Sequence, residues 1–248
     1  MKKLLFFTGI LLLTCITFFF PLGGSRNPLV KGNFEIAKKK GKSGTDYTYY
    51  KKGKNKIGFT TTRPDRKDSS ILICIPAAFT RLTDFRVDGF YCENGVAGNT
   101  DSINHHIGGA MKIKGDSVWI FATNKGKFFT KGMIDTLKNE KATAFQQIQM
   151  IKNFVAEDSK SEKKFQSRGI AVMFDGEVCI VESEQAITLK TFAQDLAGED
   201  NVKELLYTDM GAWDEGWYRD PITKKIRVMG KNLSQTSKQS NWVYIKKP

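Results

Sequence analysis

Residues 205–220, with the sequence LLYTDMGAWDEGWYRD, combine carboxylates, glycines and aromatic rings in one short stretch. Carboxylates can bind sugar hydroxyls or transfer protons, and an aromatic ring can cover the apolar face of a sugar. The stretch therefore predicts a carbohydrate site in which Asp209 orients the substrate or acts in acid/base chemistry, and Trp213 or Trp217 stacks on the sugar. The alternative is a tight turn between two strands, with both tryptophans in the core and the acids in solvent.

The residues before Asp209 explain how such a site would be positioned. Residues 205–208 are apolar and rich in strand formers, which predicts a buried β-strand. The strand would deliver Asp209 into a turn where Gly211 allows close approach of the backbone and Asp214 adds a second acid for substrate binding.

A second polar, glycine-rich region covers residues 85–109. Asp88 and Gly89 are candidates for substrate binding, because a glycine at the end of a strand permits a bulge or a close backbone approach. His105 and His106 are the only histidines of the chain, and in a polar loop they could transfer a proton. The alternative for this pair is a solvated loop without a function.

The remaining pattern predicts hairpins and a few helices. Residues 46–62, 111–122 and 168–182 are typical of β-hairpins, the last two with Gly-Asp and Asp-Gly turns. Residues 135–155 show roughly helical spacing of apolar side chains, and residues 189–196 predict a helix with Thr188 as its N-cap. We expect an α+β fold, with a mixed, largely antiparallel sheet and a few packed helices, forming a single domain after an N-terminal signal.

The N-terminus has the features of an export signal. Two lysines precede the apolar run Leu4–Phe20, and small residues follow it. The run is nearly long enough to span a bilayer, so retention as an N-terminal anchor is an alternative to cleavage. We expect a signal peptide or anchor over 1–25, a basic lead-in over 26–70 and the folded domain over 71–248. The exported chain would be periplasmic, at the cell surface or secreted, or attached to a membrane through its N-terminus.

The charge favours anionic partners. The chain carries a formal net charge of +13, and removal of Lys2 and Lys3 lowers this by two, to +11. Such a field attracts phosphorylated glycans, acidic polysaccharides or lipid headgroups. The lysines are spread along the chain and no nucleic-acid-binding motif is present, so we expect no nucleic acid partner.

The cysteines of the chain give little indication of its function. Beyond the leader, Cys74, Cys92 and Cys179 permit at most one disulfide and one free thiol. Cys74 and Cys179 lie in apolar, strand-like runs, where a small buried side chain is the simplest explanation. No Cys/His spacing indicates zinc, so no metal site is predicted, and the sequence identifies no cofactor.

The order of elements in the C-terminal half resembles the phosphodiester glycosidase family. The family pattern has an Arg before an apolar strand, a DG turn, a helix that opens with Thr-Leu, and a strand that ends in an acid and glycines. The corresponding segments here are RGIAVMFDGEVCIVES, TLKTFAQDLAG and ELLYTDMGAWDEG. Upstream, residues 87–91 and 108–115 are similar to the family's earlier glycine-bearing segments, so the resemblance covers residues 70–248.

This resemblance implies an enzyme that hydrolyses a sugar-1-phosphodiester or a related glycosidic linkage in a carbohydrate or phosphorylated glycan. Arg168 would pair bidentately with the phosphodiester anion, and Asp209 would orient the substrate or act in acid/base chemistry. Met210, Ala212 and Trp213 stand where the family has Gly, Gly and Ser. These departures favour, as the alternative, a non-catalytic glycan-binding surface protein with the same fold. A third possibility is a basic surface protein that recognises acidic polymers mainly through charge.

Overall fold

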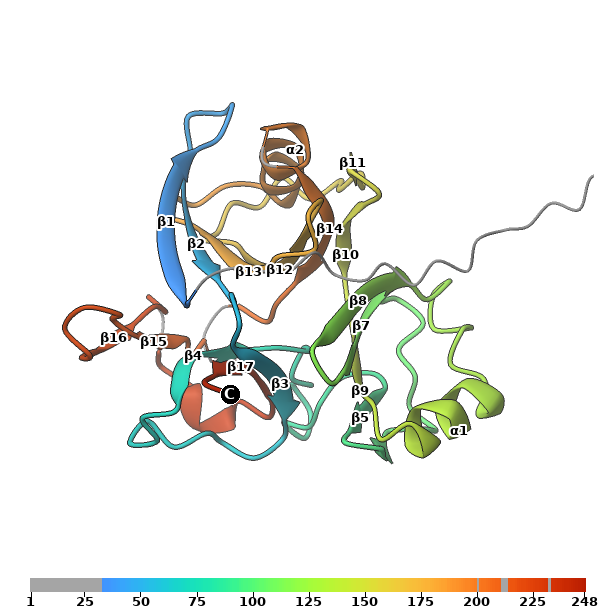
Figure 1. The fold of residues 1–248 in the computed structure, drawn as a ribbon. Helices are drawn as coiled ribbons and strands as arrows, with labels where there is room; N and C mark the ends of the chain where they lie inside the picture. Colours follow the sequence, from blue (N-terminus) through green and yellow to red (C-terminus); the bar gives the residue numbers. More distant parts are fainter. Residues whose placement is uncertain (1–32, 200, 211–213, 232) are drawn as a thin grey trace, which may run out of the picture.

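The computed structural model describes residues 33–199, 201–210, 214–231 and 233–248 (Figure 1). The expected signal or anchor over 1–25 lies outside the described residues. In the described part, no helix is long and apolar enough to cross a bilayer.

In the described residues the fold consists of three antiparallel sheets and two α-helices (Figure 1). The seven-stranded sheet has the order β1 (Glu35–Lys40), β2 (Asp46–Lys51), β13 (Val178–Ser183), β12 (Arg168–Met173), β14 (Val202–Tyr207), β10 (Gln149–Lys152), β11 (Val155–Ala156). One five-stranded sheet has the order β16 (Ile226–Val228), β15 (Trp217–Arg219), β4 (Ile71–Pro76), β17 (Trp242–Lys246), β3 (Lys56–Thr60). The other has the order β6 (Val96–Gly98), β5 (Tyr91–Glu93), β9 (Thr143–Gln147), β7 (Gly109–Lys114), β8 (Ser117–Ala122).

The seven-stranded sheet is covered on both faces. Alternate residues of a strand point to opposite faces, and in β14 Leu205 and Leu206 belong to two different core clusters. Leu206 packs with Ile170 against side chains of the two five-stranded sheets, among them Phe145. Leu205 packs under α2 (Leu189–Glu199), with Phe192. The central strands are therefore continuous apolar runs, as expected for strands that are buried on both sides.

The expected fold class is confirmed. The structure is an α+β single domain whose described strand pairs are all antiparallel. The hairpins over 111–122 and 168–182 are present as β7–β8 and β12–β13. The helix that begins after Thr188 is also present, and the Thr188 hydroxyl accepts a hydrogen bond from the Thr191 amide at 3.0 Å, as expected of an N-cap.

The helical interpretation of residues 135–155 is wrong beyond Asn139. Helix α1 covers Lys131–Asn139, and the chain then enters β9 and β10. All five residues of β9 are buried, so the strand has no exposed face to give it an alternating pattern. Gln146 and Gln147 resembled the polar face of a helix, but their side-chain amides are buried and bond to backbone groups.

The hairpin expected over residues 46–62 is also wrong. Both strands exist, but β2 pairs with β1 and β13, whereas β3 pairs with β17 in another sheet. Residues 26–70, expected to lead into the domain, thus contribute β1, β2 and β3 to two of its sheets.

Cys74, Cys92 and Cys179 are free and buried. Burial raises the pKa of all three thiols. Because the thiolate is the reactive form, we expect iodoacetamide to label these cysteines at least roughly 100-fold more slowly in the folded protein than in denaturant. Mass spectrometry of the labelled peptides checks this, and rapid labelling of Cys74 or Cys179 under native conditions would contradict it.

Candidate functional site

Arg168 is the centre of a buried ion cluster at the start of β12. Its side chain is fully buried, and its strand position lies opposite Glu182 of β13. Nε donates to Glu182 Oε2 at 2.5 Å, while Nη1 and Nη2 donate to Asp214 Oδ1 and Oδ2 at 2.8 and 3.1 Å. The bidentate partner of the guanidinium is therefore Asp214, and neither a substrate anion nor Asp209 is required to neutralise it.

Burial and neighbouring charges shift the pKa values of Arg168 and Glu182 in opposite directions. Burial alone would lower the pKa of the Arg168 guanidinium, but the charges of Glu182 and Asp214 outweigh burial and raise that pKa. Burial raises the pKa of the Glu182 carboxyl, and the charge of Arg168 offsets only part of this effect. The guanidinium stays charged and fixed in place, so its role is to position the two carboxylates.

Gly216 allows the chain to pass directly over the guanidinium. A Cβ at this position would lie 2.8 Å from Arg168 Nη1 and 3.1 Å from Nη2 and Cζ. The Gly216 amide also donates to Asp214 Oδ1 at 3.0 Å, which fixes the carboxylate from a second direction. The glycine is thus needed for close packing of backbone against a charged plane.

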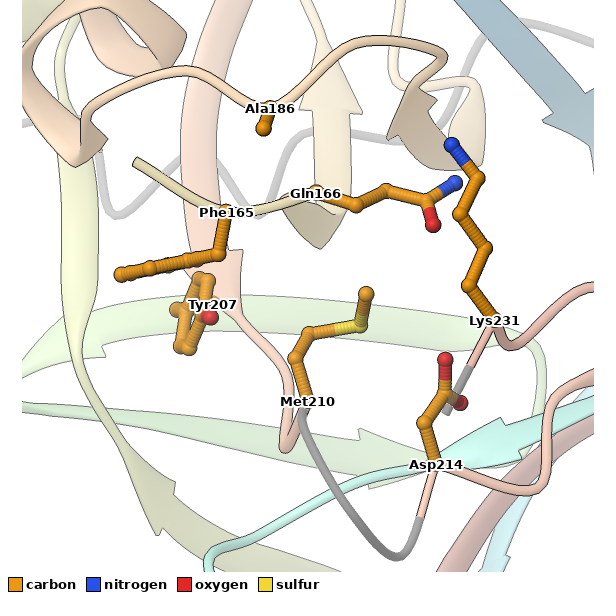
Figure 2. A pocket seen from close by; sticks show the side chains of 7 residues that line it. All are labelled: Phe165, Gln166, Ala186, Tyr207, Met210, Asp214 and Lys231. Carbon is orange, nitrogen blue, oxygen red and sulfur yellow. The ribbon is translucent and has the colours of Figure 1, made fainter. Parts of the chain in front are cut away.

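A cavity of about 410 Å³ lies beside this cluster, and Asp214 forms part of its wall (Figure 2). Phe165 and Tyr207 form an aromatic side, with ring centroids 6.4 Å apart in an edge-on arrangement. Figure 2 shows the side chains of Gln166, Lys231 and Asp214 on the other side of the cavity. The remaining lining residues are Ala186 and Met210.

The polar wall of the cavity is connected to the ion cluster. Gln166 donates from Nε2 to Glu182 Oε1 at 2.6 Å, so one carboxylate holds both the cavity wall and Arg168. Asp214 Oδ1 accepts two hydrogen bonds from described residues and Oδ2 accepts one. Because a carboxylate oxygen has two lone pairs, Oδ2 has one that no hydrogen bond from the described residues uses.

Asp209 follows β14 but faces a neighbouring segment rather than this cavity's lining. It is buried, and its Oδ2 accepts a hydrogen bond from the Thr80 amide at 3.0 Å. Its own amide donates to Ala77 O. Asp209 and Arg168 come from neighbouring positions, since the Thr208 amide donates to Arg168 O at 3.1 Å, but neither side chain is among the described residues that line this cavity.

Asp88, which precedes Gly89, bonds to residues 77–80, the segment that also bonds to Asp209. The Asp88 amide donates to Phe79 O, and Asp88 Oδ2 accepts from Asn104 at 3.0 Å. Gly89 is buried with φ +85°, and a Cβ there would meet Gln146 Oε1 at 2.8 Å. Gly89 is therefore required by conformation and packing.

The two histidines are exposed in the loop before β7. His105 Nδ1 lies 2.9 Å from Lys125 O, and the His106 backbone amide donates to Asn104 Oδ1 at 2.8 Å. Neither histidine lines the cavity beside Asp214. A role of the two histidines in proton transfer stays a prediction.

The interpretation of Trp217 as a sugar-stacking residue is wrong for this structure. Its side chain is 2% exposed and packs with Ile71, Cys74 and Trp242 in a core cluster. Strand β15 pairs with β4, which turns the indole into the protein. Gly211 and Trp213 lie outside the described residues.

Several cavity residues were not identified from the sequence. Phe165, Gln166, Ala186 and Lys231 come from loops far apart in the chain, and only tertiary structure brings them together. Glu182 could have been identified from the sequence, because an acid that directly follows the apolar run VCIV in a strand must find a buried partner. Among the described residues, no group of three or more His, Cys, Asp or Glu side chains converges as metal ligands would.

Comparison with known proteins shows which solved structures have a similar fold. The sequence matches no protein-family model and no curated protein. The structure is similar to that of the zebrafish N-acetylglucosamine-1-phosphodiester alpha-N-acetylglucosaminidase (NAGPA) catalytic domain auto-inhibited by pro-peptide, with a TM-score of 0.58 and 9% identity, over 90% of this chain and 85% of that chain. The chain shares its fold with a glycosidase catalytic domain.

A second solved structure has similar architecture. It is a hypothetical protein from Synechocystis, with a TM-score of 0.56 and 9% identity, over 87% of this chain and 62% of that chain. At this level of identity, both comparisons support the fold and leave the roles of individual side chains to the geometry of this site.

The buried cluster predicts a large loss of stability on removal of its cation. We expect Arg168→Ala to lower the free energy of unfolding by about 3–5 kcal/mol, because Glu182 and Asp214 would be left without their counter-charge. Arg227→Ala is the matched control: its side chain is 54% exposed, and we expect a change within about 0.5 kcal/mol. Urea unfolding measures both, and equal small effects would contradict the structural role of the cluster.

The position of Trp217 leads to a separate expectation. Trp217→Ala should lower the free energy of unfolding by about 3–5 kcal/mol through loss of core packing. Trp119, which is 46% exposed, provides the control, and its replacement by Ala should cost less than about 1 kcal/mol. A Trp217→Ala protein of wild-type stability would show that this indole is outside the core.

Proposed function

We propose that the chain is an exported hydrolase that cleaves a sugar-1-phosphodiester, or a related glycosidic linkage, in a glycan. The observation that carries the proposal is the cavity in which an aromatic side faces a carboxylate, an amide and an ammonium group. The similarity of the fold to a catalytic domain named for action on an N-acetylglucosamine-1-phosphodiester supports the same class of substrate. Export is inferred from the leader sequence alone.

The cavity suits one sugar ring with a charged substituent. Its volume of about 410 Å³ lies in the range of small-molecule sites, about 300–1,000 Å³. Phe165 and Tyr207 offer apolar surface to a sugar face, and the Gln166 amide can bond to a hydroxyl. The ligand would therefore be held by stacking on one side and by polar groups on the other.

Lys231 is the cation available to a phosphodiester in this cavity. Its side chain reaches the cavity wall, and its Nζ donates to Glu184 O at 3.0 Å. An ammonium group has three N–H donors, so further donors remain for a phosphate oxygen. Arg168 cannot take this role in the observed geometry, since its fork is bonded to Glu182 and Asp214.

Asp214 is the carboxylate that would act on the reacting centre. Water attacks the anomeric carbon, the bond between that carbon and the bridging oxygen breaks, and the phosphate monoester leaves with the bond's electron pair and the oxygen. Asp214 stabilises the positive charge that develops on the sugar and accepts the proton of the water. Phosphate is a good leaving group whose second pKa is about 6, so a separate general acid is not required.

Tyr207 adds a hydrogen-bond donor at the same end of β14. Burial raises the pKa of its hydroxyl, and the nearby charge of Asp209 acts in the same direction. The hydroxyl therefore stays protonated at neutral pH and can donate to a sugar or bridging oxygen.

Binding without turnover is the second candidate function. The observation that favours it is the commitment of Asp214 to Arg168 and to the Gly216 amide, which occupies three of its four acceptor positions. A site built in this way could hold a sugar phosphate and lack the freedom to activate water. The same cavity would then serve as a glycan-binding site on an exported protein.

Turnover separates the two functions. We expect the purified protein to release free sugar and a phosphate monoester from at least one member of a panel of sugar-1-phosphodiesters. In ¹⁸O-labelled water the label should appear in the sugar, because the bond to the anomeric carbon breaks. Saturable binding without product would support the binding function. The absence of both binding and product across the panel would contradict both candidate functions.

Variants of the cavity wall test the assigned roles. Lys231→Met should raise KM, or Kd, for the phosphodiester by about 10-fold through loss of a charged hydrogen bond, without loss of stability. Lys225→Met, at an exposed lysine that does not line the cavity, should leave both values unchanged. Asp214→Asn should lower kcat by at least about 100-fold. Unchanged kinetics in both Lys231→Met and Asp214→Asn would exclude this cavity as the site.

A further inference from the structure

Two hairpin turns of the seven-stranded sheet present an exposed cluster of apolar side chains, which we call the aromatic tip: Phe154, Val155 and Phe174. Their exposed fractions are 38%, 66% and 74%. The two phenylalanine rings contact each other, with centroids 5.9 Å apart. Phe154 belongs to the turn between β10 and β11, and Phe174 to the turn between β12 and β13.

Backbone hydrogen bonds fix both turns to the start of β14. The Phe154 amide donates to Lys203 O and the Phe174 amide donates to Asn201 O, each at 2.9 Å. The two rings are therefore held side by side by the sheet, on different segments of the chain. A cluster that is anchored in this way keeps its apolar surface in water in the isolated protein.

The conformation of Phe154 is unusual for its residue type. Asn153 and Phe154 have φ values of +46° and +68° and form a two-residue turn between Lys152 and Val155. This turn type strongly favours Asn followed by Gly, and a bulky residue at the second position is disfavoured. The chain adopts the unfavourable conformation and thereby places a large apolar ring at the tip.

Other exposed apolar side chains of the described residues are differently placed. Leu82 and Ile222, which are 71% and 87% exposed, lie in the connections β4–β5 and β15–β16, outside the seven-stranded sheet. Phe128 is 46% exposed and pairs with Phe121, which is half-buried. Phe128 is thus the best matched control for the aromatic tip.

The described chain begins beside the tip. Asn33 lines a cavity together with Phe174 and Asn201. The apolar run Leu4–Phe20 is joined to Asn33 by residues 21–32, which can span at most about 40 Å when extended. If the run enters a bilayer, the aromatic tip is thus within reach of the surface of that bilayer.

The charges near the tip indicate what it contacts. Lys152 and Lys203 are exposed beside it, and Asp175 and Glu177 follow Phe174, with Glu177 accepting a hydrogen bond from the Gly53 amide. The tip therefore has nearly balanced charge, which does not suit a polyanion. Exposed aromatic rings flanked by lysines suit the boundary between headgroups and acyl chains.

We propose that the aromatic tip inserts into the surface of a lipid bilayer and orients the domain on it. The tip lies at the start of β14 and the Asp214 cavity at its other end, about 17 Å away at about 3.3 Å per residue. The bilayer would thus be met by one end of the sheet, while the cavity at the other end faces away and stays open to a glycan.

Fluorescence quenching in vesicles tests the proposal with the full chain. Phe174→Trp adds a reporter to the tip, and the protein is reconstituted into phosphatidylcholine vesicles with or without bromine on the upper part of the acyl chains. We expect the emission added by this tryptophan to fall by roughly two-fold or more with brominated lipid. Phe128→Trp, measured in the same way, should show no such loss.

Two further results are decisive. Adding Phe154→Ser to Phe174→Trp should reduce the quenching, because the paired ring is lost. Equal quenching in Phe174→Trp and Phe128→Trp would overturn the proposal. A lipid-independent blue shift of the Phe174→Trp emission that grows with protein concentration would also overturn it, by showing that the tip contacts a second copy. None of these readouts depends on hydrolase activity.

Discussion

A guanidinium with no access to water holds the site together. Arg168 has Glu182 on one side and Asp214 on the other, and an unpaired charge in such a place would cost several kcal/mol. The interaction joins β12, β13 and the segment that leads into β15, which are distant in sequence. It also determines where Asp214 lies, so the position of the carboxylate in the wall of this cavity follows from a buried ion pair.

The seven-stranded sheet has two ends with different chemistry. At the end of β14, Tyr207 and Asp214 line a cavity that has an aromatic side and a polar side. At its start, Phe154 and Phe174 form an apolar surface beside the point where the described chain begins. A rigid sheet that is covered on both faces keeps these two ends at a fixed distance, which lets one end attach while the other remains accessible.

Local signals in the sequence were sufficient for much of the fold. The β7–β8 and β12–β13 hairpins have short turns between paired strands, so neighbouring residues determine them. The hairpin predicted over residues 46–62 is wrong because β3 pairs with β17, which lies far along the chain. Residues 143–147 resembled part of a helix because β9 is buried on both faces and therefore shows no alternating pattern. The site was found only in part: Asp214 lies in the predicted stretch, whereas tertiary packing alone places Phe165 and Lys231 beside it and buries Trp217.

The most direct test is a crystal structure of the chain with a non-hydrolysable sugar-1-phosphonate. The account predicts the sugar ring against Phe165 and Tyr207, the phosphonate at Lys231, and the anomeric carbon beside Asp214 Oδ2, with the Arg168 guanidinium still bonded to its two carboxylates. A ligand bound elsewhere, or a phosphonate held directly by Arg168 after release of Asp214, would contradict it.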